Sequence, residues 1–240
     1  MFGPTGRFAP WRFNWLANHK IVGALLRVRV HARGRLLDVG CGSQPFAHVF
    51  AGQVERYCGT DLFASRHLRG VRPIAYAIAE AQPFRAGSFD TMLGLSMLNC
   101  LTEPARMISE AARVLKPGGV LILEFTQMVP LHDEPHDYWR FTRLGAEHLL
   151  RQHGFEPIEY VPVGGLWARV GLTTIAGLNR LNRGPTRVLT ELPVRLLYVV
   201  LQLAFEVLDR IFFDPREVLA HVVVARNPPA TGEGAPASSG

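Results

Sequence analysis

One short stretch of the sequence concentrates side chains that can move protons and hold charges. Residues 130–142 contain two histidines, three carboxylates, a tyrosine and an arginine. A histidine oriented by a carboxylate is a suitable general base for a hydroxyl group near pH 7. The alternative is that the aromatic residues only pack this loop and that the charges are solvated. The candidates are His132 or His136 for the base, Asp133 or Asp137 for the orienting carboxylate, and Arg140 for an anion-binding group.

A glycine-bearing turn is the second place where the sequence indicates a ligand. Leu36–Val39 is mostly apolar, which is typical of a strand buried on both faces. Gly40 and Gly42 then allow a left-handed backbone or a close approach that a side chain would block. Open α/β sheets bind their ligands at the carboxyl ends of strands, so the turn predicts a binding site.

The carboxylate of Asp38, beside this turn, discriminates between ligands. It would repel a pyrophosphate, whereas it would attract an ammonium or a sulfonium group. A dinucleotide-binding turn also needs a third glycine, and Pro45 or Phe46 stands at that place. S-adenosylmethionine carries both cations and no phosphate, so the turn favours this cofactor over a nicotinamide dinucleotide.

A second acid is expected at the end of the next strand. Arg56–Asp61 reads as a strand, and Asp61 lies about 20 residues beyond the glycine turn, where doubly wound folds place a carboxylate on ribose hydroxyls. The alternative is an aspartate that caps a turn or a helix.

Three segments resemble the class I S-adenosylmethionine-dependent methyltransferases of the type-11 methyltransferase-domain group. They are the run from Asp38 to Gly42, the run from Ala79 to Asp90, and Leu115–Gly119 followed by an apolar strand. The resemblance implies a Rossmann-like, seven-stranded, mostly parallel sheet with helices on both faces. It also implies S-adenosylmethionine as the cofactor and no metal. The cofactor contacts that we expect are Asp38, Gly40, Cys41, Gly42, Asp61, Leu62, Ala79, Glu80 and Ser96.

The sequence departs from this family in two places. Ile78 stands where relatives usually have an aspartate for the adenine amino group, so adenine would rest on the backbone near Ala79 and on Glu80. Asn99 and Cys100 stand where relatives often have an acid and a histidine. We expect Cys100 to be a buried thiol, because methyl transfer needs no cysteine nucleophile.

The resemblance implies a methyltransferase for a small-molecule, glycan or lipid-linked acceptor, with O-methylation favoured. Two alternatives stay open, namely a non-catalytic S-adenosylmethionine-binding protein of the same fold and a nucleotide-cofactor oxidoreductase. Nucleic acid is not the expected partner, because the sequence shows no recognition module or base-flipping motif.

The remaining periodicity predicts the elements that position these residues. Thr142 is expected to cap a helix that stops at Gly154. The other expected helices are 21–30, 45–51 and 104–115, the last ended by Lys116–Gly119, and the other expected strands are 74–78, 91–95, 120–125, 155–163 and 219–226. The domains that we expect are an arm and helix at 1–34, with residues 1–19 as the arm, a core at 35–165, a helical insert at 166–213, a last core strand at 214–227 and a disordered tail at 228–240.

Composition and charge limit the setting of the protein. The chain has 240 residues, 48% hydrophobic and 19% charged residues, and a formal net charge of +6. Residues 1–35 contain seven lysines and arginines and no acid, which fits an anionic partner or a solvated basic surface. Three cysteines without a paired spacing indicate reduced thiols, and no signal peptide is evident, so we expect a cytoplasmic protein, with contact to the inner face of the membrane left open.

The insert at 166–213 is unusually apolar for a segment outside the main sheet. Leu192–Phe205 is too short to span a bilayer, and charged residues flank it. We expect amphipathic helices that lie on a membrane surface or form a homodimer or partner contact. The alternative is a lid that buries its apolar side on the domain itself.

Overall fold

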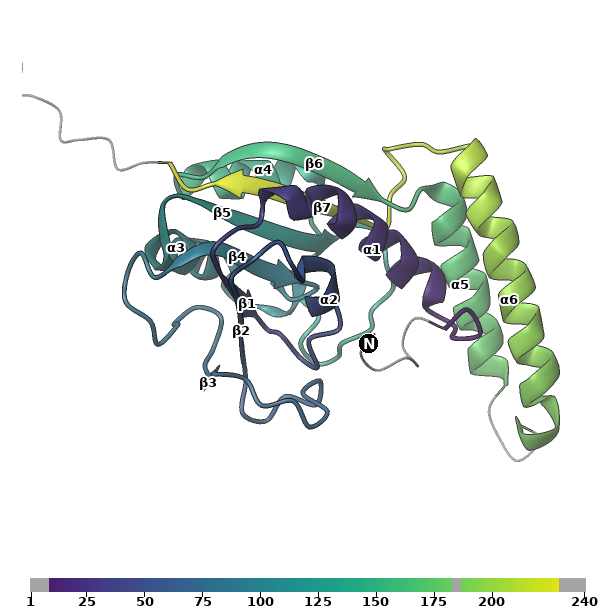
Figure 1. The fold of residues 1–240 in the computed structure, drawn as a ribbon. Helices are drawn as coiled ribbons and strands as arrows, with labels where there is room; N and C mark the ends of the chain where they lie inside the picture. Colours follow the sequence, from purple (N-terminus) through teal and green to yellow (C-terminus); the bar gives the residue numbers. More distant parts are fainter. Residues whose placement is uncertain (1–8, 183–186, 229–240) are drawn as a thin grey trace, which may run out of the picture.

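The strand before the glycine turn, β1 (Arg35–Val39), lies inside a seven-stranded sheet in the computed structural model, which describes residues 9–182 and 187–228 (Figure 1). The strand order is β3-β2-β1-β4-β5-β7-β6. Neighbours from β3 to β5 are parallel, whereas β7 pairs antiparallel with both β5 and β6. The predicted seven-stranded, mostly parallel sheet is therefore confirmed. The predicted tail from 229 on, and residues 1–8 of the predicted arm, lie outside the described residues.

The other strands follow the predicted order along the chain. Their bounds are β2 (Arg56–Asp61), β3 (Ala75–Tyr76), β4 (Phe89–Leu95), β5 (Leu115–Thr126), β6 (Glu156–Val163) and β7 (Ala220–Arg226). Strand β3 has two residues where 74–78 was expected.

Helices cover both faces of the sheet because successive strand residues point to opposite sides. Leu121 and Leu123 of β5 belong to the core beneath α3 (Pro104–Val114) and α4 (Arg143–Gln152). Val120 and Ile122 belong to the opposite core, beneath α1 (Trp15–Val28) and the short α2 (Ala47–Phe50). The predicted cap is confirmed, since the Thr142 hydroxyl accepts a hydrogen bond from the Gly145 N–H.

The first helix begins earlier than predicted. Helix α1 starts at Trp15, so the end of the predicted arm is helical. The physical reason lies 186 residues further along the chain, where Gln202 Oε1 accepts the Leu16 N–H at 3.0 Å. A helix start that a distant side chain caps leaves no local signal.

The predicted turn at Lys116–Gly119 is also different in the structure. Strand β5 begins at Leu115, directly after α3, and residues 116–119 bulge within it, because Phe89 pairs with Leu115 and Thr91 pairs with Val120. The ion pair between Lys116 and Asp90, at 2.7 Å, and the Gly118 N–H bond to the Asn227 carbonyl hold the bulge to its neighbours.

The insert forms a hairpin of two long helices, α5 (Leu166–Leu181) and α6 (Arg187–Ile211), which lie side by side (Figure 1). The two helices pack closely, since Phe205 lies against Gly171, where a Cβ atom would come within 2.7 Å of the ring. Helix α5 starts just after β6, so the hairpin stands at the end of the sheet where the parallel strands have their carboxyl ends. Among the described residues, no helix is long and apolar enough to cross a membrane.

Candidate active site

The glycine turn after β1 has the geometry that the sequence predicts. Gly40 and Gly42 have φ values of +70° and +49°, which favour glycine. The Cys41 N–H donates to the Thr60 carbonyl at 3.0 Å, and the Gly42 N–H donates to Asp61 Oδ2 at 2.7 Å. The turn is thus tied to the end of β2.

Both carboxylate oxygens of Asp61 accept hydrogen bonds from backbone N–H groups. Oδ2 accepts the Gly42 N–H, and Oδ1 accepts the Leu62 N–H at 2.7 Å. This is the turn-stabilising role that the sequence left as the alternative. Each oxygen keeps a second lone pair, so a contact with ribose hydroxyls is compatible with these bonds and stays a prediction.

Asp38 is buried and lacks a cationic partner among the described residues. Its Oδ2 accepts a hydrogen bond from the Tyr57 hydroxyl at 2.5 Å. Burial, with a further contribution from the charge of Asp61, raises the pKa of Asp38 to about 7, although the Tyr57 bond opposes the shift. A bound ammonium or sulfonium group would favour the ionised form of such a carboxylate.

Apolar side chains beside Asp61 suit a flat, apolar ring. Leu62, Phe63, Tyr76 and Ile78 are all exposed around the paired ends of β2 and β3. The Phe63 and Tyr76 rings meet edge to face at 5.1 Å between centroids. We call these four exposed residues the apolar shelf. The carboxylates without a cation, the glycine turn and the apolar shelf together fit the amino acid, ribose and adenine parts of S-adenosylmethionine. Sequence reasoning missed Phe63 and Tyr76, whose signal was an aromatic residue near each of two strand ends.

The other predicted cofactor residues differ in what they offer. The Cys41 thiol is buried toward β2, where a Cβ atom on Gly59 would lie 2.7 Å from its sulfur, and burial raises its pKa to about 12. Only the backbone of Cys41 is therefore suited to the predicted contact. Ala79 is buried and Glu80 is half-buried in the turn after β3, closed by the Ala81 N–H bond to the Ile78 carbonyl.

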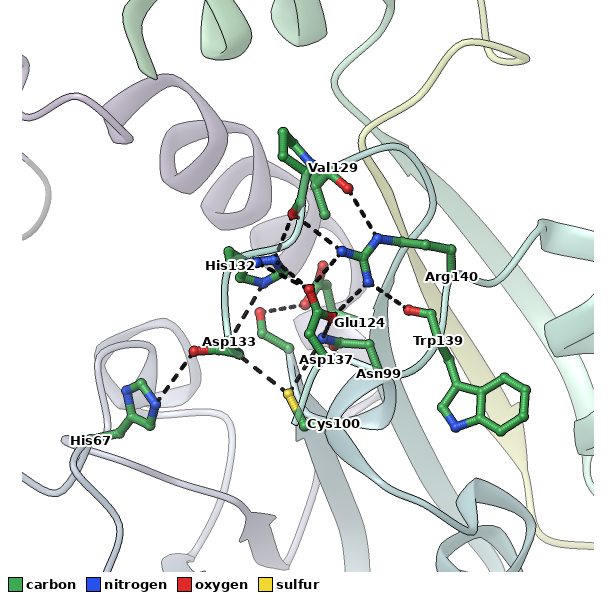
Figure 2. A network of polar contacts seen from close by, with 12 residues as sticks. His67, Asn99, Cys100, Glu124, Val129, His132, Asp133, Asp137, Trp139 and Arg140 are labelled. Atoms are coloured by element: carbon green, nitrogen blue, oxygen red, sulfur yellow. Dashed lines mark hydrogen bonds and ion pairs between the residues drawn. The ribbon is translucent and has the colours of Figure 1, made fainter. Parts of the chain in front are cut away.

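The loop between β5 and α4 is anchored to the segment that follows β4. The Asn99 carbonyl accepts the N–H groups of Tyr138 and Trp139, and the Trp139 indole donates to the Leu101 carbonyl at 2.8 Å. Figure 2 shows Asn99, Asp137 and Arg140 converging at this anchor. The loop thereby lies over the carboxyl ends of β4 and β5, as expected.

Asp137 and Arg140 form the centre of the loop (Figure 2). The guanidinium binds both Asp137 oxygens, at 2.6 and 2.7 Å, and donates its other hydrogens to the Val129, Pro130 and Trp139 carbonyls. Asp137 also accepts the Asn99 amide and the His132 N–H. The bond from Arg140 is the main cause that lowers the pKa of Asp137.

This arrangement corrects the role expected for Arg140. An arginine has five N–H donors, and all five of Arg140 are used within the loop. The predicted contact with an anionic group of a substrate therefore has no donor left. Arg140 instead fixes the loop conformation.

His132 is the histidine that the loop surrounds with carboxylates. Its Nδ1 lies 3.0 Å from the Pro130 carbonyl, which can only accept, so Nδ1 carries the proton and Nε2 the lone pair. Asp137 Oδ2 lies 3.3 Å from Nδ1, and Asp133 Oδ2 lies 3.7 Å from Nε2. His136 is exposed like His132, but within the described residues it forms no ion pair with a carboxylate, and its Nδ1 meets the Tyr138 hydroxyl at 3.1 Å.

Sequence reasoning missed Glu124, which lies beside His132 in Figure 2. This residue interrupts the apolar run of β5 and is buried, and its Oε2 accepts a hydrogen bond from the predicted cofactor residue Ser96 at 2.6 Å. Burial raises the pKa of Glu124, while the hydrogen bond from Ser96 and the nearby His132 lower it. The signal in the sequence was one acid inside Val120–Phe125.

Two other chemistries find little support around the loop. Burial raises the pKa of the Cys100 thiol to about 11, and the carboxylates of Asp133 and Asp137 add to the shift, so the thiolate nucleophile is disfavoured. Within the described ranges, no group of three or more histidine, cysteine or acidic side chains is arranged to hold a metal ion.

Comparisons with known proteins agree with this geometry. Residues 37–123 match the family model of the methyltransferase domain. A ubiquinone biosynthesis O-methyltransferase of Burkholderia vietnamiensis is 28% identical over 226 residues, which cover 76% of this chain and 89% of the relative.

Solved structures share the fold. A crystal structure of an S-adenosylmethionine-dependent methyltransferase from Thermotoga maritima matches with a TM-score of 0.54 at 19% identity, over 91% of each chain. The [4+2]-cyclase SpnF matches with a TM-score of 0.59 at 22% identity, over 95% of this chain and 86% of that one.

The matched domain and the relatives identify the chain as an S-adenosylmethionine-dependent methyltransferase, and the solved structures show that it has the class I fold. It is an enzyme, and its cofactor is S-adenosylmethionine. This class sets aside the two alternatives drawn from the sequence, a non-catalytic binding protein and a nucleotide-cofactor oxidoreductase.

Proposed function

We propose that this enzyme methylates a hydroxyl oxygen of a small-molecule, glycan or lipid-linked acceptor, with His132 as the general base. The observation that carries the proposal is the imidazole of His132, held by the Pro130 carbonyl with its Nε2 lone pair available at the carboxyl ends of β4 and β5. The Burkholderia relative, named an O-methyltransferase, supports an oxygen acceptor.

The cofactor, when bound, supplies a methyl group on a sulfonium sulfur. The residues around the glycine turn, with Asp61 and the apolar shelf, would hold it, so that much of the rate comes from positioning the acceptor oxygen in line with the methyl group. Nε2 of His132 would take the hydroxyl proton of the acceptor, and the carbon–sulfur bond of the sulfonium would break as its methyl group passes to the oxygen, leaving a neutral thioether. The resulting imidazolium is stabilised by the nearby carboxylates of Asp137 and Glu124.

Arg140 and Asp137 act through the loop rather than on the acceptor. Their bidentate pair fixes the loop, and the Asp137 carboxylate also accepts the His132 backbone N–H at 3.1 Å. His132 is partly exposed, so the proton that it accepts can leave to solvent.

The two histidines of the loop provide a matched test. An acceptor is first found by measuring S-adenosylhomocysteine release with a panel of phenols, hexoses and polyprenyl-linked glycans. His132→Asn should then lower the rate by about 10²–10⁴, while cofactor affinity stays near that of the wild type. His136→Asn should retain most of the rate. Equal rates for the two variants would remove His132 as the base, and a loss of cofactor affinity would assign the loop to cofactor binding.

A further inference from the structure

In helix α6, buried polar residues face the domain and exposed apolar residues face away from it. Its side toward the domain carries Gln202, Glu206 and Asp209, which are all buried. Its other side carries an outer stripe of apolar residues that are 43–71% exposed, where an ordinary surface helix would carry polar residues. At about 100° per residue, this stripe fills an arc of about 140° on the side opposite the buried polar residues. The outer stripe consists of Leu192, Leu196, Leu197, Val200, Leu203, Val207 and Ile211.

This orientation corrects the expectation of a lid that buries its apolar side on the domain. The polar residues of α6 fix which side faces inward. Lys20 of α1 lies 2.9 Å from both Glu206 and Asp209, and Gln202 caps the start of α1. A rotation of α6 that buried the outer stripe would separate these charges from their partners, at a cost of several kcal/mol. The exposure of the outer stripe therefore follows from the ion pairs and hydrogen bonds that fix the inward side of α6.

Basic residues of the hairpin are available to an anionic surface, whereas the exposed aromatic residues nearby lie against the inner side of α6. Residues 166–190 contain four arginines and no acid, and of the two whose side chains the structure describes, Arg180 is exposed and Arg169 pairs with Glu217. Residues 9–13, from the acid-free segment 1–35, contact the hairpin, because Gln202 Nε2 donates to the Pro10 and Arg12 carbonyls. A groove of about 310 Å³ separates these residues from α5 and α6. Trp11 and Phe13 are exposed there.

We propose that the outer stripe of α6, with the exposed Arg180 of the same hairpin, docks the enzyme on the surface of an anionic lipid bilayer. An apolar helix face on a hairpin that also carries exposed arginine has the composition of interfacial helices. The arginines attract anionic headgroups, while the stripe enters the boundary between headgroups and acyl chains. A second copy of the chain, with its net charge of +6, would cover the stripe but would bring more positive charge.

The docking surface and the candidate active site lie at the same end of the molecule. Helix α5 begins three residues after β6 ends, at the edge where β4 and β5 also have their carboxyl ends (Figure 1). An enzyme docked through α6 would therefore hold this edge of the sheet near the bilayer. The proposal does not depend on O-methylation, since binding is measured without any acceptor.

The test is flotation of the full-length protein with vesicles of phosphatidylcholine alone and of phosphatidylcholine with an equal share of phosphatidylglycerol. The stripe variant combines Leu196→Gln with Val200→Gln, and its control combines Leu144→Gln with Val30→Gln. The four side chains are similarly exposed, at 60%, 62%, 66% and 70%. Circular dichroism and S-adenosylmethionine binding verify that each variant is folded.

We expect the wild type to float with the anionic vesicles, the control to match it, and the stripe variant to bind at least about tenfold more weakly. Arg180→Gln should weaken binding by about fivefold, and neutral vesicles should bind less protein. The proposal is overturned if the folded wild type stays unbound, or if the stripe variant floats like the control. A wild-type dimer that the stripe variant dissociates would make a second copy the occupant.

Discussion

The strand ends and the segments that cover them bury carboxylates in opposite ways. In the covering loop and hairpin, Asp137 lies against Arg140, and Asp209 lies 2.9 Å from Lys20. At the strand ends, Asp38 and Glu124 are also buried, but no lysine or arginine of the described residues forms an ion pair with either.

The carboxylates of the covering loop and hairpin are structural, because they also accept hydrogen bonds from backbone N–H groups. Asp209 accepts the N–H groups of Gly165 and Ala168, which begin α5, and Asp137 accepts the His132 N–H. A buried ion pair with its remaining lone pairs used offsets its own desolvation and fixes one geometry. Asp38 and Glu124 have raised pKa values instead, and such values gather where a ligand or a reaction supplies the missing charge. We therefore assign the carboxylates that are paired with a cation to the stability of the fold, and the unpaired ones to the function of the site.

Removing the hairpin's cation should have the largest effect on folding. Lys20→Met leaves Asp209 buried without a cation and Glu206 with Arg210 as its remaining close cation, which should lower the free energy of unfolding by about 3–5 kcal/mol. Arg27→Met, on the same helix, is the control, because its partner Glu159 lies near the surface and the loss should stay within about 1 kcal/mol. Urea denaturation measures both. Equal losses would show that the hairpin pair is no more structural than a surface pair.

Removing the loop's cation should affect activity more than folding. Arg140→Met should lower the methylation rate at least about 100-fold through the displaced His132, and stability at pH 7 by roughly 2–3 kcal/mol. The folded pKa of Asp137 is lowered, so the stability it contributes is present above its unfolded pKa, about 4, and is lost as the pH falls further. The stability gap between wild type and variant should therefore shrink between pH 7 and pH 3. A gap that stays constant would contradict the ion-pair assignment.

Asp61 tests whether a strand-end carboxylate also binds the cofactor. Asp61→Ala should weaken S-adenosylmethionine binding by about 1–3 kcal/mol, measured by calorimetry. Because Asp61 also holds Gly42 and Leu62, a cofactor analogue without ribose hydroxyls separates the two roles. The analogue should bind the wild type more weakly than the cofactor, but the variant should not distinguish them. If Asp61→Ala binds the cofactor like the wild type, the ribose assignment is wrong.

The sequence predicted what depends on short-range patterns. The apolar strands, the glycine turn and the Thr142 cap each have local signals, and each is present in the structure. What it missed depends on contacts between distant segments. The start of α1 is capped by Gln202, and the outward face of α6 is set by Lys20.

The candidate site divides in the same way. The composition of the loop predicted a cluster around His132, but the residue types could not show which partners each side chain meets. Arg140 could have held a substrate until its five donors were seen to be used. Glu124 lies within an apolar strand, and the sequence does not show which residues face it. Its burial could therefore be recognised only from the structure.

The smallest expected effect is a pH dependence of cofactor affinity set by Asp38. Its pKa is raised to about 7, so at lower pH the group is protonated and cannot attract a cation. Affinity for S-adenosylmethionine should rise with pH, by up to about tenfold per unit below pH 7, and level off above it. Binding near pH 7 should also release protons, because the bound cation favours the carboxylate, and calorimetry in two buffers of different ionisation enthalpy detects this. Asp38→Asn should bind more weakly, with a flatter profile. Asp90→Asn is the control, since the pKa of Asp90 is lowered and the group stays ionised throughout this range. A wild-type profile that matches that of Asp38→Asn would place Asp38 among the structural carboxylates, as the acceptor of the Tyr57 hydroxyl.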